Sequence, residues 1–143
     1  MYKEAVQGMG DCQGPVLDIE KAATDRVTIL VGTYNGERFL DEQLQSIIHQ
    51  SHDNWQIIAS DDGSTDGTPV LLKRYQQLLG EERLRIIQGP RKGFAANFMA
   101  LANVPRTDAD YFAFSDQDDV WHPDHLQRAL KWMQSLDGDI PTL

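Results

Sequence analysis

The sequence contains two clusters of aspartates, and each follows a short run of apolar residues. Asp61-Asp62 ends one run, and residues 116–119, Asp-Gln-Asp-Asp, end another. Adjacent carboxylates repel one another, so a cluster costs stability unless a cation or an array of hydrogen-bond donors offsets the charge. Carboxylate oxygens are preferred ligands of Mg²⁺ and Mn²⁺, and Mg²⁺ is commonly held by one or two carboxylates together with substrate phosphates. The clusters therefore predict a site for a divalent cation and a diphosphate.

Asp116-Gln117-Asp118 is the more specific of the two clusters. In an extended segment, residues two apart point to the same side, so Asp116 and Asp118 are expected to face one ligand while Gln117 points away. The spacing alone is common, because residues 108–110 and 137–139 also read Asp-x-Asp, and both are interpreted as surface turns. What distinguishes the triplet at 116 is the aromatic strand predicted directly before it.

The other cluster continues through residues 61–67, which are spaced like the start of a calcium-binding loop. With Asp62 as the first ligand, the twelfth position is Lys73, where such a loop requires a bidentate glutamate, so this interpretation is excluded. The remaining interpretation is a turn from a strand into a helix, capped by Asp66 or by one of the two residues before it. Asp61 would then accept a hydrogen bond from a base or a sugar.

Motifs that hold phosphate through backbone groups are missing from the sequence. The chain has no Gly-x-x-x-x-Gly-Lys-Ser/Thr sequence, and no Gly-x-Gly-x-x-Gly sequence follows its first apolar run. A nucleotide would therefore be held by a metal ion, by backbone and by side chains. Arg91-Lys92-Gly93 opens a predicted helix and has two interpretations: it supplies positive charge beside a diphosphate, or its cations are solvated on the surface.

The alternation of apolar runs with helix-like segments indicates how these clusters are positioned. Strands are predicted over residues 27–31, 55–59, 84–87 and 111–114, with a helical spacing of apolar residues after each one. Because parallel strands need crossover connections, this order predicts an α/β fold, a mostly parallel sheet with helices on both faces. Ligands of such sheets bind beyond the carboxyl ends of the strands, so both aspartate clusters are expected at one edge.

Composition and charge limit the class of protein. The chain has 143 residues and is 41% hydrophobic, which suits one globular domain, and we divide it into a tail over residues 1–25 and a domain over residues 26–143. Its net charge of −9 argues against a nucleic-acid partner. No apolar run is long enough to cross a bilayer, the first residues do not read as a secretory signal, and Cys12 is the only cysteine. These features favour a cytoplasmic protein.

Four segments in a fixed order resemble the family 2 glycosyltransferases. They read Val-Thr-Ile-Leu-Val-Gly-Thr-Tyr-Asn at 27–35, Ile-Ile-Ala-Ser-Asp-Asp-Gly-Ser-Thr-Asp-Gly-Thr at 57–68, Gly-Phe-Ala-Ala-Asn at 93–97 and Phe-Ala-Phe-Ser-Asp-Gln-Asp-Asp-Val-Trp at 112–121. Together they extend the resemblance over roughly residues 26–135. The last segment is similar to the branch that builds bacterial polysaccharide and lipopolysaccharide side chains, rhamnosyltransferases included.

The resemblance implies a GT-A fold of the nucleotide-diphospho-sugar transferase type, an inverting mechanism and a nucleoside-diphosphate-sugar donor of the UDP or dTDP type. A divalent cation, Mg²⁺ or Mn²⁺, is implied as cofactor, with Asp118 as its ligand and Asp116 beside the ribose or sugar. Asp61 would accept from the pyrimidine ring, and Asn97 with Gly93 would shape the wall by the ribose or diphosphate. The implied donor-binding residues are Thr33, Tyr34, Asn35, Glu37, Asp61, Lys92, Gly93, Asn97, Asp116 and Gln117.

The chain ends at Leu143, soon after the helix that follows the acidic segment, so the expected fold is a truncated GT-A domain without its acceptor-binding half. The general base that deprotonates the acceptor hydroxyl is expected beyond Leu143. The expected acceptor is a polysaccharide or lipid-linked sugar, with peripheral association at the inner face of the membrane. An uncovered apolar face would favour self-association. The alternatives are a non-catalytic nucleotide-sugar-binding or assembly module and a phosphatase or nucleotidyltransferase that uses the same acids.

Overall fold

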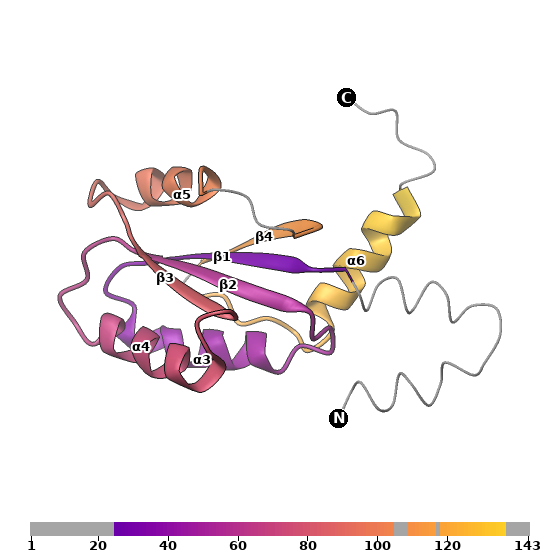
Figure 1. The fold of residues 1–143 in the computed structure, drawn as a ribbon, viewed down its shortest axis with the longest axis horizontal. Helices are drawn as coiled ribbons and strands as arrows, with labels where there is room; N and C mark the ends of the chain where they lie inside the picture. Colours follow the sequence, from indigo (N-terminus) through magenta and orange to yellow (C-terminus); the bar gives the residue numbers. More distant parts are fainter. Residues whose placement is uncertain (1–24, 105–108, 117, 137–143) are drawn as a thin grey trace.

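The computed structural model describes residues 25–104, 109–116 and 118–136, so residues 1–24 of the predicted tail, Gln117 and residues 137–143 lie outside the described part. Strands and helices alternate along the described chain, as predicted (Figure 1). The strands are β1 (Val27–Thr33), β2 (Trp55–Asp61), β3 (Leu84–Gln88) and β4 (Tyr111–Asp116). The helices are α3 (Glu37–Ile48), α4 (Thr68–Leu79), α5 (Phe94–Ala102) and α6 (His125–Leu136).

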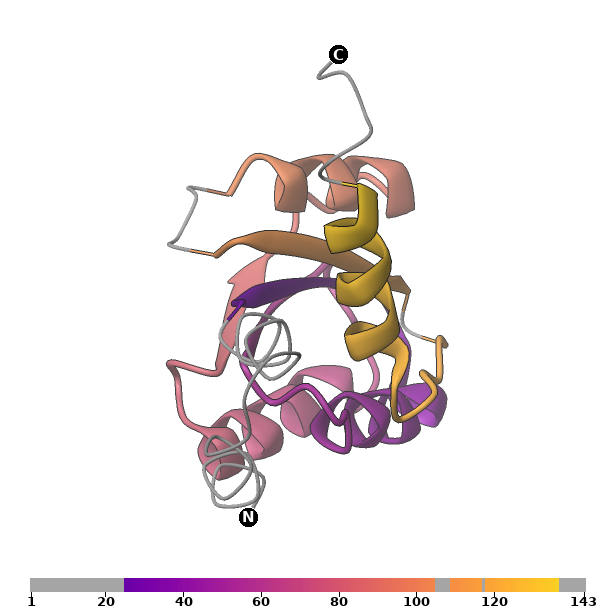
Figure 2. The same ribbon diagram turned by 90° about the vertical axis from the view of Figure 1, so that its right-hand side faces the viewer.

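The strands form one parallel sheet in the order β3-β2-β1-β4. In Figure 1, α5 covers one face of this sheet, and α3 and α4 cover the other. Figure 2 shows α6 beside the sheet, rising from the level of α3 toward that of α5. This arrangement confirms the predicted α/β fold with helices on both faces, because each connection between parallel strands returns through a helix.

The carboxyl ends of the strands bring the two aspartate clusters together. Each strand runs one or two residues further than predicted, so β2 ends with Asp61 and β4 ends with Asp116. The register pairs Asp61 with Thr33 of β1 on one side and Asp116 with Gly32 of β1 on the other. The two acidic strand ends therefore flank the end of β1, as expected for parallel neighbours.

The core lies mainly on the face covered by α3 and α4. All residues of β1 and β2 are buried, because helices cover both faces of these two central strands. The larger core consists of Val27, Ile29, Val31, Leu40, Leu44, Ile47, Trp55, Ile57, Ala59, Leu72, Tyr75, Leu84, Trp121, Leu126 and Leu130. A smaller core under α5 is formed by Leu30, Ile58 and Leu101. α6 shares the larger core with α3, which places the segment after β4 against α3.

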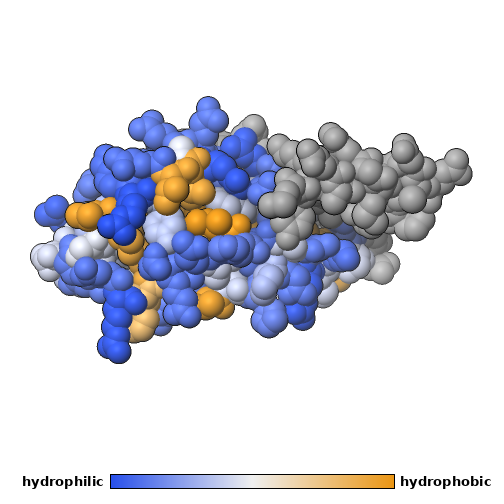
Figure 3. Space-filling view, turned by 90° about the horizontal axis from the view of Figure 1, so that it is seen from below, coloured by the Kyte–Doolittle hydropathy of each residue, from blue (hydrophilic) through white to orange (hydrophobic). Residues whose placement is uncertain are grey.

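The two sides of the molecule differ in polarity. Seen from the side of α3 and α4, the surface is mostly hydrophilic with small separate apolar areas (Figure 3). On the α5 side, Phe112 and Phe114 of the edge strand β4 are 38% and 54% exposed. The ring of Phe98 lies 4.9 Å from that of Phe94 and 5.7 Å from that of Phe114, measured between centroids. Phe94, Phe98, Phe112 and Phe114 make up an apolar strip, in which Phe98 is partly buried and the other three side chains are exposed. None of the described helices is long and apolar enough to cross a membrane.

Candidate functional site

A cavity of about 680 Å³ lies where the strands end at their carboxyl edge. Its lining residues are Gly32, Thr33, Tyr34, Asp62, Gly63, Arg91, Gly93, Phe94, Asn97, Phe98, Asp116 and Asp118. The volume is in the range that accepts a small-molecule ligand, and the lining combines aromatic rings with a few charged groups. This is the edge at which the aspartate clusters predict a ligand.

The predicted site residues divide between the cavity and its supports. Those that line the cavity are Thr33, Tyr34, Gly93, Asn97, Asp116 and the predicted metal ligand Asp118. Those that the lining does not include are Asn35, Glu37, Asp61 and Lys92. Gln117 lies outside the described residues. Lining a cavity does not test nucleotide binding, so the binding role of each of these residues stays a prediction.

Asp61 is buried and hydrogen-bonded to the protein. One carboxylate oxygen, Oδ1, accepts from the hydroxyls of Thr33 at 2.9 Å and Ser64 at 2.6 Å. The other, Oδ2, accepts from the backbone N–H of Ser64 at 3.0 Å. The side chain therefore holds the turn after β2 against the end of β1. The predicted contact between Asp61 and a pyrimidine ring would have to add to these bonds.

Asn35 and Glu37 join the loop after β1 to the loop after β2. Asn35 has a positive φ of 48°, and its side-chain oxygen accepts from the backbone N–H of Thr65 at 2.8 Å. Glu37 accepts from the backbone N–H of Gly67 at 3.0 Å. Asp66, one of the candidate caps, accepts from the first N–H of α4 at 2.9 Å. In this structure Asn35 and Glu37 therefore hold the two loops together and are not part of the cavity lining.

Asp62 was not among the predicted site residues, yet it organises one wall of the cavity. Its carboxylate accepts from the backbone N–H groups of Arg91 at 2.5 Å and Gly93 at 3.0 Å. These two backbone N–H groups, which lie just before α5, are therefore already hydrogen-bonded to Asp62. Arg91 adopts a positive φ of 60°, a rare conformation for a residue with a side chain. The signal in the sequence was the pair of adjacent aspartates. Successive residues at a strand end point to opposite sides, so Asp61 and Asp62 must have different surroundings.

The cation beside the cavity is Arg91 and not Lys92. The aliphatic part of the Arg91 side chain passes close over Gly63, where an added Cβ would lie 3.2 Å from its Cγ. Gly63 also has a positive φ of 91°, so the turn needs glycine both for its backbone and for the space above it. The sequence left two interpretations open for Arg91-Lys92-Gly93: positive charge beside a diphosphate, or cations solvated on the surface. The structure favours one of its two cations for that position.

Asn97 couples α5 to the sheet behind the cavity. Its amide Nδ2 donates to the backbone carbonyl of Ser60 at 3.0 Å, and its Oδ1 accepts from the Ser60 hydroxyl at 2.6 Å. Gly32 and Gly89 leave room for this side chain, because a Cβ would lie 3.3 Å from Nδ2 at Gly32 and 2.6 Å from Oδ1 at Gly89. Asn97 is 3% exposed. Its hydrogen bonds to Ser60 fix the position of α5 in the cavity wall.

Asp116 and Asp118 both line the cavity, but Asp118 does not lie in the extended segment that was expected. β4 ends at Asp116, and the backbone then turns, with the N–H of Asp119 donating to the carbonyl of Asp116 at 3.0 Å. Asp118 lies in this turn and not in an extended segment. The two residues therefore reach the same cavity across a turn and not along an extended strand.

The carboxylates of the acidic segment repel one another, and a bound cation would offset this repulsion. Burial raises the pKa of Asp116, and the nearby charges of Asp119 and Asp118 raise it further. Among the described residues, no group of three or more His, Cys, Asp or Glu side chains is placed to hold a metal. Two carboxylates beside an open cavity suit a cation such as Mg²⁺ that also takes substrate phosphate oxygens. The residues present therefore fit a divalent cation shared with a diphosphate.

This repulsion has a measurable pH dependence. Because the pKa of Asp116 is raised in the folded chain, its contribution to stability is present when it is protonated and is lost as pH rises through that pKa. We expect Asp119→Asn to lower the pKa of Asp116 and to raise the melting temperature at pH 7, with little change at pH 3. Carboxyl-resonance titration by NMR, together with thermal melts at both pH values, measures these effects. An unchanged Asp116 titration would contradict the expectation.

A parallel sheet with helices on both faces, and a cavity with an acidic pair at its carboxyl edge, are features of an α/β protein of the GT-A type. Residues 28–142 match the family model of Glycosyl transferase family 2. This chain belongs to that family. It spans less than half the length of the curated relatives it matches, at 41%, 38% and 35% for three of them.

One relative and two solved structures illustrate the similarity. The dTDP-rhamnosyl transferase RfbG of Shigella flexneri is 39% identical over 103 residues, covering 70% of this chain and 35% of RfbG. The mannosyltransferase PcManGT of Pyrobaculum calidifontis, in complex with GDP-Man and Mn²⁺, covers 99% of this chain and 43% of its own, with a TM-score of 0.69 and 24% identity. S. aureus TarS 1-349 in complex with UDP covers 77% of this chain and 32% of its own, with a TM-score of 0.61 and 24% identity. The two structures share the fold of this chain.

Proposed function

We propose that this chain supplies donor and metal binding to a glycosyltransferase that moves a sugar, with inversion, from a nucleoside-diphosphate-sugar to a polysaccharide or lipid-linked acceptor. The observation that carries the proposal is the cavity, which places Tyr34, Arg91 and the pair Asp116 and Asp118 around one space. The name of RfbG and the nucleotides bound in the two solved structures support a nucleoside-diphosphate-sugar donor. The Mn²⁺ in PcManGT supports a divalent cation.

Each cavity residue has a role that follows from its chemistry. The Tyr34 ring is 54% exposed at the cavity and offers a flat surface on which a base can stack. The Arg91 guanidinium would donate to diphosphate oxygens, for which its planar fork of N–H groups is suited. Asp116 and Asp118 would hold Mg²⁺ or Mn²⁺. That cation would offset the negative charge that the departing nucleoside diphosphate gains as the glycosidic bond breaks.

The general base is assigned to none of the described carboxylates that line the cavity. Asp62 already accepts two backbone hydrogen bonds, and Asp116 and Asp118 are assigned to the cation. We therefore keep the expectation that the base lies beyond Leu143. A cytoplasmic location at the inner face of the membrane is proposed for the whole protein, because a lipid-linked acceptor would be reached there.

Calorimetry tests the proposed function directly. We expect the chain to bind UDP or dTDP with an affinity that rises when Mn²⁺ or Mg²⁺ is added, because the cation joins the two carboxylates to the diphosphate. GDP and free phosphate serve as reference ligands. The absence of metal-dependent binding to any nucleoside diphosphate would refute the proposal.

Arg91 and Lys92 provide a matched pair of variants. We expect Arg91→Met to weaken UDP or dTDP binding about tenfold, the size of a charge-assisted hydrogen bond. Lys92→Met removes the same charge one residue away, outside the cavity lining, and we expect it to change the affinity less than about twofold, since an exposed and screened charge contributes little. Calorimetry of both variants measures the difference. Equal losses would show that the contribution is long-range charge and not a contact by Arg91.

Self-association is proposed through the apolar strip of Phe94, Phe98, Phe112 and Phe114. An exposed edge strand with aromatic side chains is a surface to which a second copy can add. We expect the chain to dimerise in sedimentation experiments at micromolar concentrations, and Phe114→Lys to shift it toward the monomer. A monomer at all concentrations would contradict this expectation.

A further inference from the structure

Helix α3 and its C-terminal end carry three polar side chains toward the acidic segment. Gln43, Ser46 and Gln50 are spaced three and four residues apart, which places them on one side of the helix. Gln43 is 0% exposed and Gln50 is 2% exposed. Burial of an amide is costly unless its polar atoms are hydrogen-bonded, so these glutamines need partners. Both find them in the segment that begins with Ser115 and Asp116.

Gln43 holds the first end of that segment. Its Nε2 donates to the hydroxyl of Ser115 at 2.7 Å and to the backbone carbonyl of Asp116. The same carbonyl accepts from the N–H of Asp119, so the amide contacts the turn that carries Asp118. Among the described residues the Gln43 Oε1 atom has no partner. Gln43 therefore contributes to this contact through its donor, because its buried oxygen, unpaired within the described part of the chain, is costly.

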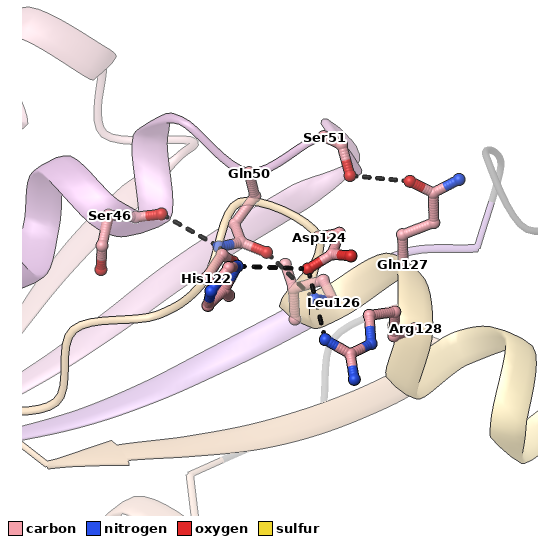
Figure 4. A network of polar contacts seen from close by, with 8 residues as sticks. All are labelled: Ser46, Gln50, Ser51, His122, Asp124, Leu126, Gln127 and Arg128. Carbon is pink, nitrogen blue, oxygen red and sulfur yellow. Dashed lines mark hydrogen bonds and ion pairs between the residues drawn. The ribbon is translucent and has the colours of Figure 1, made fainter.

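Ser46 and Gln50 hold the other end, and Figure 4 shows the side chain of Gln50 beside His122 and Leu126. The hydroxyl of Ser46 accepts from the backbone N–H of Trp121 at 3.1 Å. The side chain of Gln50 donates to the carbonyl of His122 at 2.6 Å and accepts from the N–H of Leu126 at 3.0 Å. The second of these bonds satisfies one of the N–H groups that open α6. The chain is therefore held to α3 again directly after the acidic turn.

Asp118 lies between these two attachments. Its segment carries three like charges, which repel one another and favour an open, extended arrangement when no cation is bound. The attachments to α3 oppose that opening, because they fix Asp116 on one side of the turn and residues 121–122 on the other. A short loop with both ends fixed samples few conformations, which keeps its carboxylates close to one geometry.

We propose that Gln43, Ser46 and Gln50 are positioning residues that fix both ends of the acidic turn and so preorganise Asp116 and Asp118 for the cation. The inference rests on the proposed function for its ligand. It assigns to α3, which contributes none of the described residues of the cavity lining, control over the affinity for the metal. If these residues served only to dock α6 on α3, the same contacts would be present. Their substitution would then not change metal binding selectively.

The first experiment needs no ligand. Gln43→Met keeps the length of the side chain and removes its donor, and Ser46→Ala removes the acceptor at the other end with a smaller change. Gln45→Met is the control, because Gln45 is exposed on the same helix and donates to Tyr75 at 2.8 Å, away from the acidic turn. Hydrogen exchange by mass spectrometry should show residues 116–124 exchanging on the order of tenfold faster in both test variants, as expected for the loss of one hydrogen bond. The control should match the wild type there.

The second experiment measures UDP binding with and without Mn²⁺. We expect Gln43→Met and Ser46→Ala to weaken Mn²⁺-dependent UDP binding about tenfold, an effect typical of removing a group that orients a metal ligand, while binding of UDP alone is unchanged. Unchanged exchange over residues 116–124 in both variants would overturn the positioning role. Faster exchange with unaltered Mn²⁺ dependence would overturn the link to the metal. A wild-type chain without metal-dependent binding would refute the proposed function, and the exchange data would still decide whether α3 positions the turn.

Discussion

Asp118→Asn should abolish most of the metal-dependent part of nucleotide binding by this chain. The substitution keeps the size of the side chain and removes the charge that would bind the cation. Asp116 alone would then remain beside the diphosphate at this edge of the sheet. Loss of an outer partner of a metal ligand typically costs 10–100-fold in affinity, so loss of the ligand itself should cost at least about 100-fold. Calorimetry with UDP, with and without Mn²⁺, measures the ratio.

Asp119→Asn is the matched control for this prediction. It removes the same charge one residue away, from a side chain that does not line the cavity. It also keeps an oxygen that can accept from the N–H of Asp116, as the Asp119 carboxylate does at 3.1 Å. We expect a much smaller loss of Mn²⁺-dependent binding than in Asp118→Asn, because Asp119 acts on Asp116 only through its charge and does not line the cavity. Similar losses in both variants would show that net charge, and not ligation by Asp118, attracts the cation.

Asp62→Asn should destabilise the fold and displace the cationic wall of the cavity. The Asp62 carboxylate accepts from the backbone N–H groups of Arg91 and Gly93, and an asparagine amide would present its own N–H groups to one of these donors. Hydrogen bonds to charged groups contribute about 1.5–3 kcal/mol, so we expect the free energy of unfolding to fall by about 2 kcal/mol. Urea denaturation of the variant and the wild type measures this change.

The same variant should also bind nucleotide more weakly when it is folded. Arg91 has a rare positive φ, and we expect its backbone to relax when the Asp62 carboxylate no longer accepts from its N–H. Asp53→Asn is the control, because Asp53 forms an exposed ion pair with Arg83 at 3.6 Å, and such pairs contribute at most about 1 kcal/mol. A loss of stability as small as that of the control would contradict the assigned role of Asp62.

The fold was predictable because its signals are local and periodic. The apolar runs at residues 27–31, 55–59, 84–87 and 111–114 each became a strand, and the helices between them follow from the requirement for crossovers. The convergence of the aspartate clusters also followed, since parallel strands present their carboxyl ends at one edge. The family was identifiable from the order of four motifs, and the family model covers residues 28–142.

The details of the site were less predictable because they depend on where each side chain points. Asp61 and Asp62 are adjacent and chemically identical, and only the structure shows that Asp61 holds the turn after β2 while Asp62 holds the entry to α5. Likewise Arg91 lines the cavity and Lys92 does not, and Arg91 has a positive φ. Spacing in the sequence carries no signal for such a backbone conformation at a residue other than glycine.

The sequence by itself determined the class of this protein: the alternation of strands and helices, the edge that carries the acids, and the aspartates available for a cation. Tertiary structure alone decided how Asp116 and Asp118 come to share one cavity, because the chain turns after β4 where an extended strand had been expected. It also placed Gln43 and Gln50 of the α3 region against that turn, across more than 70 residues of sequence. Hydrogen bonds between segments so far apart leave no local pattern, since each partner alone has the sequence of an ordinary helix or loop.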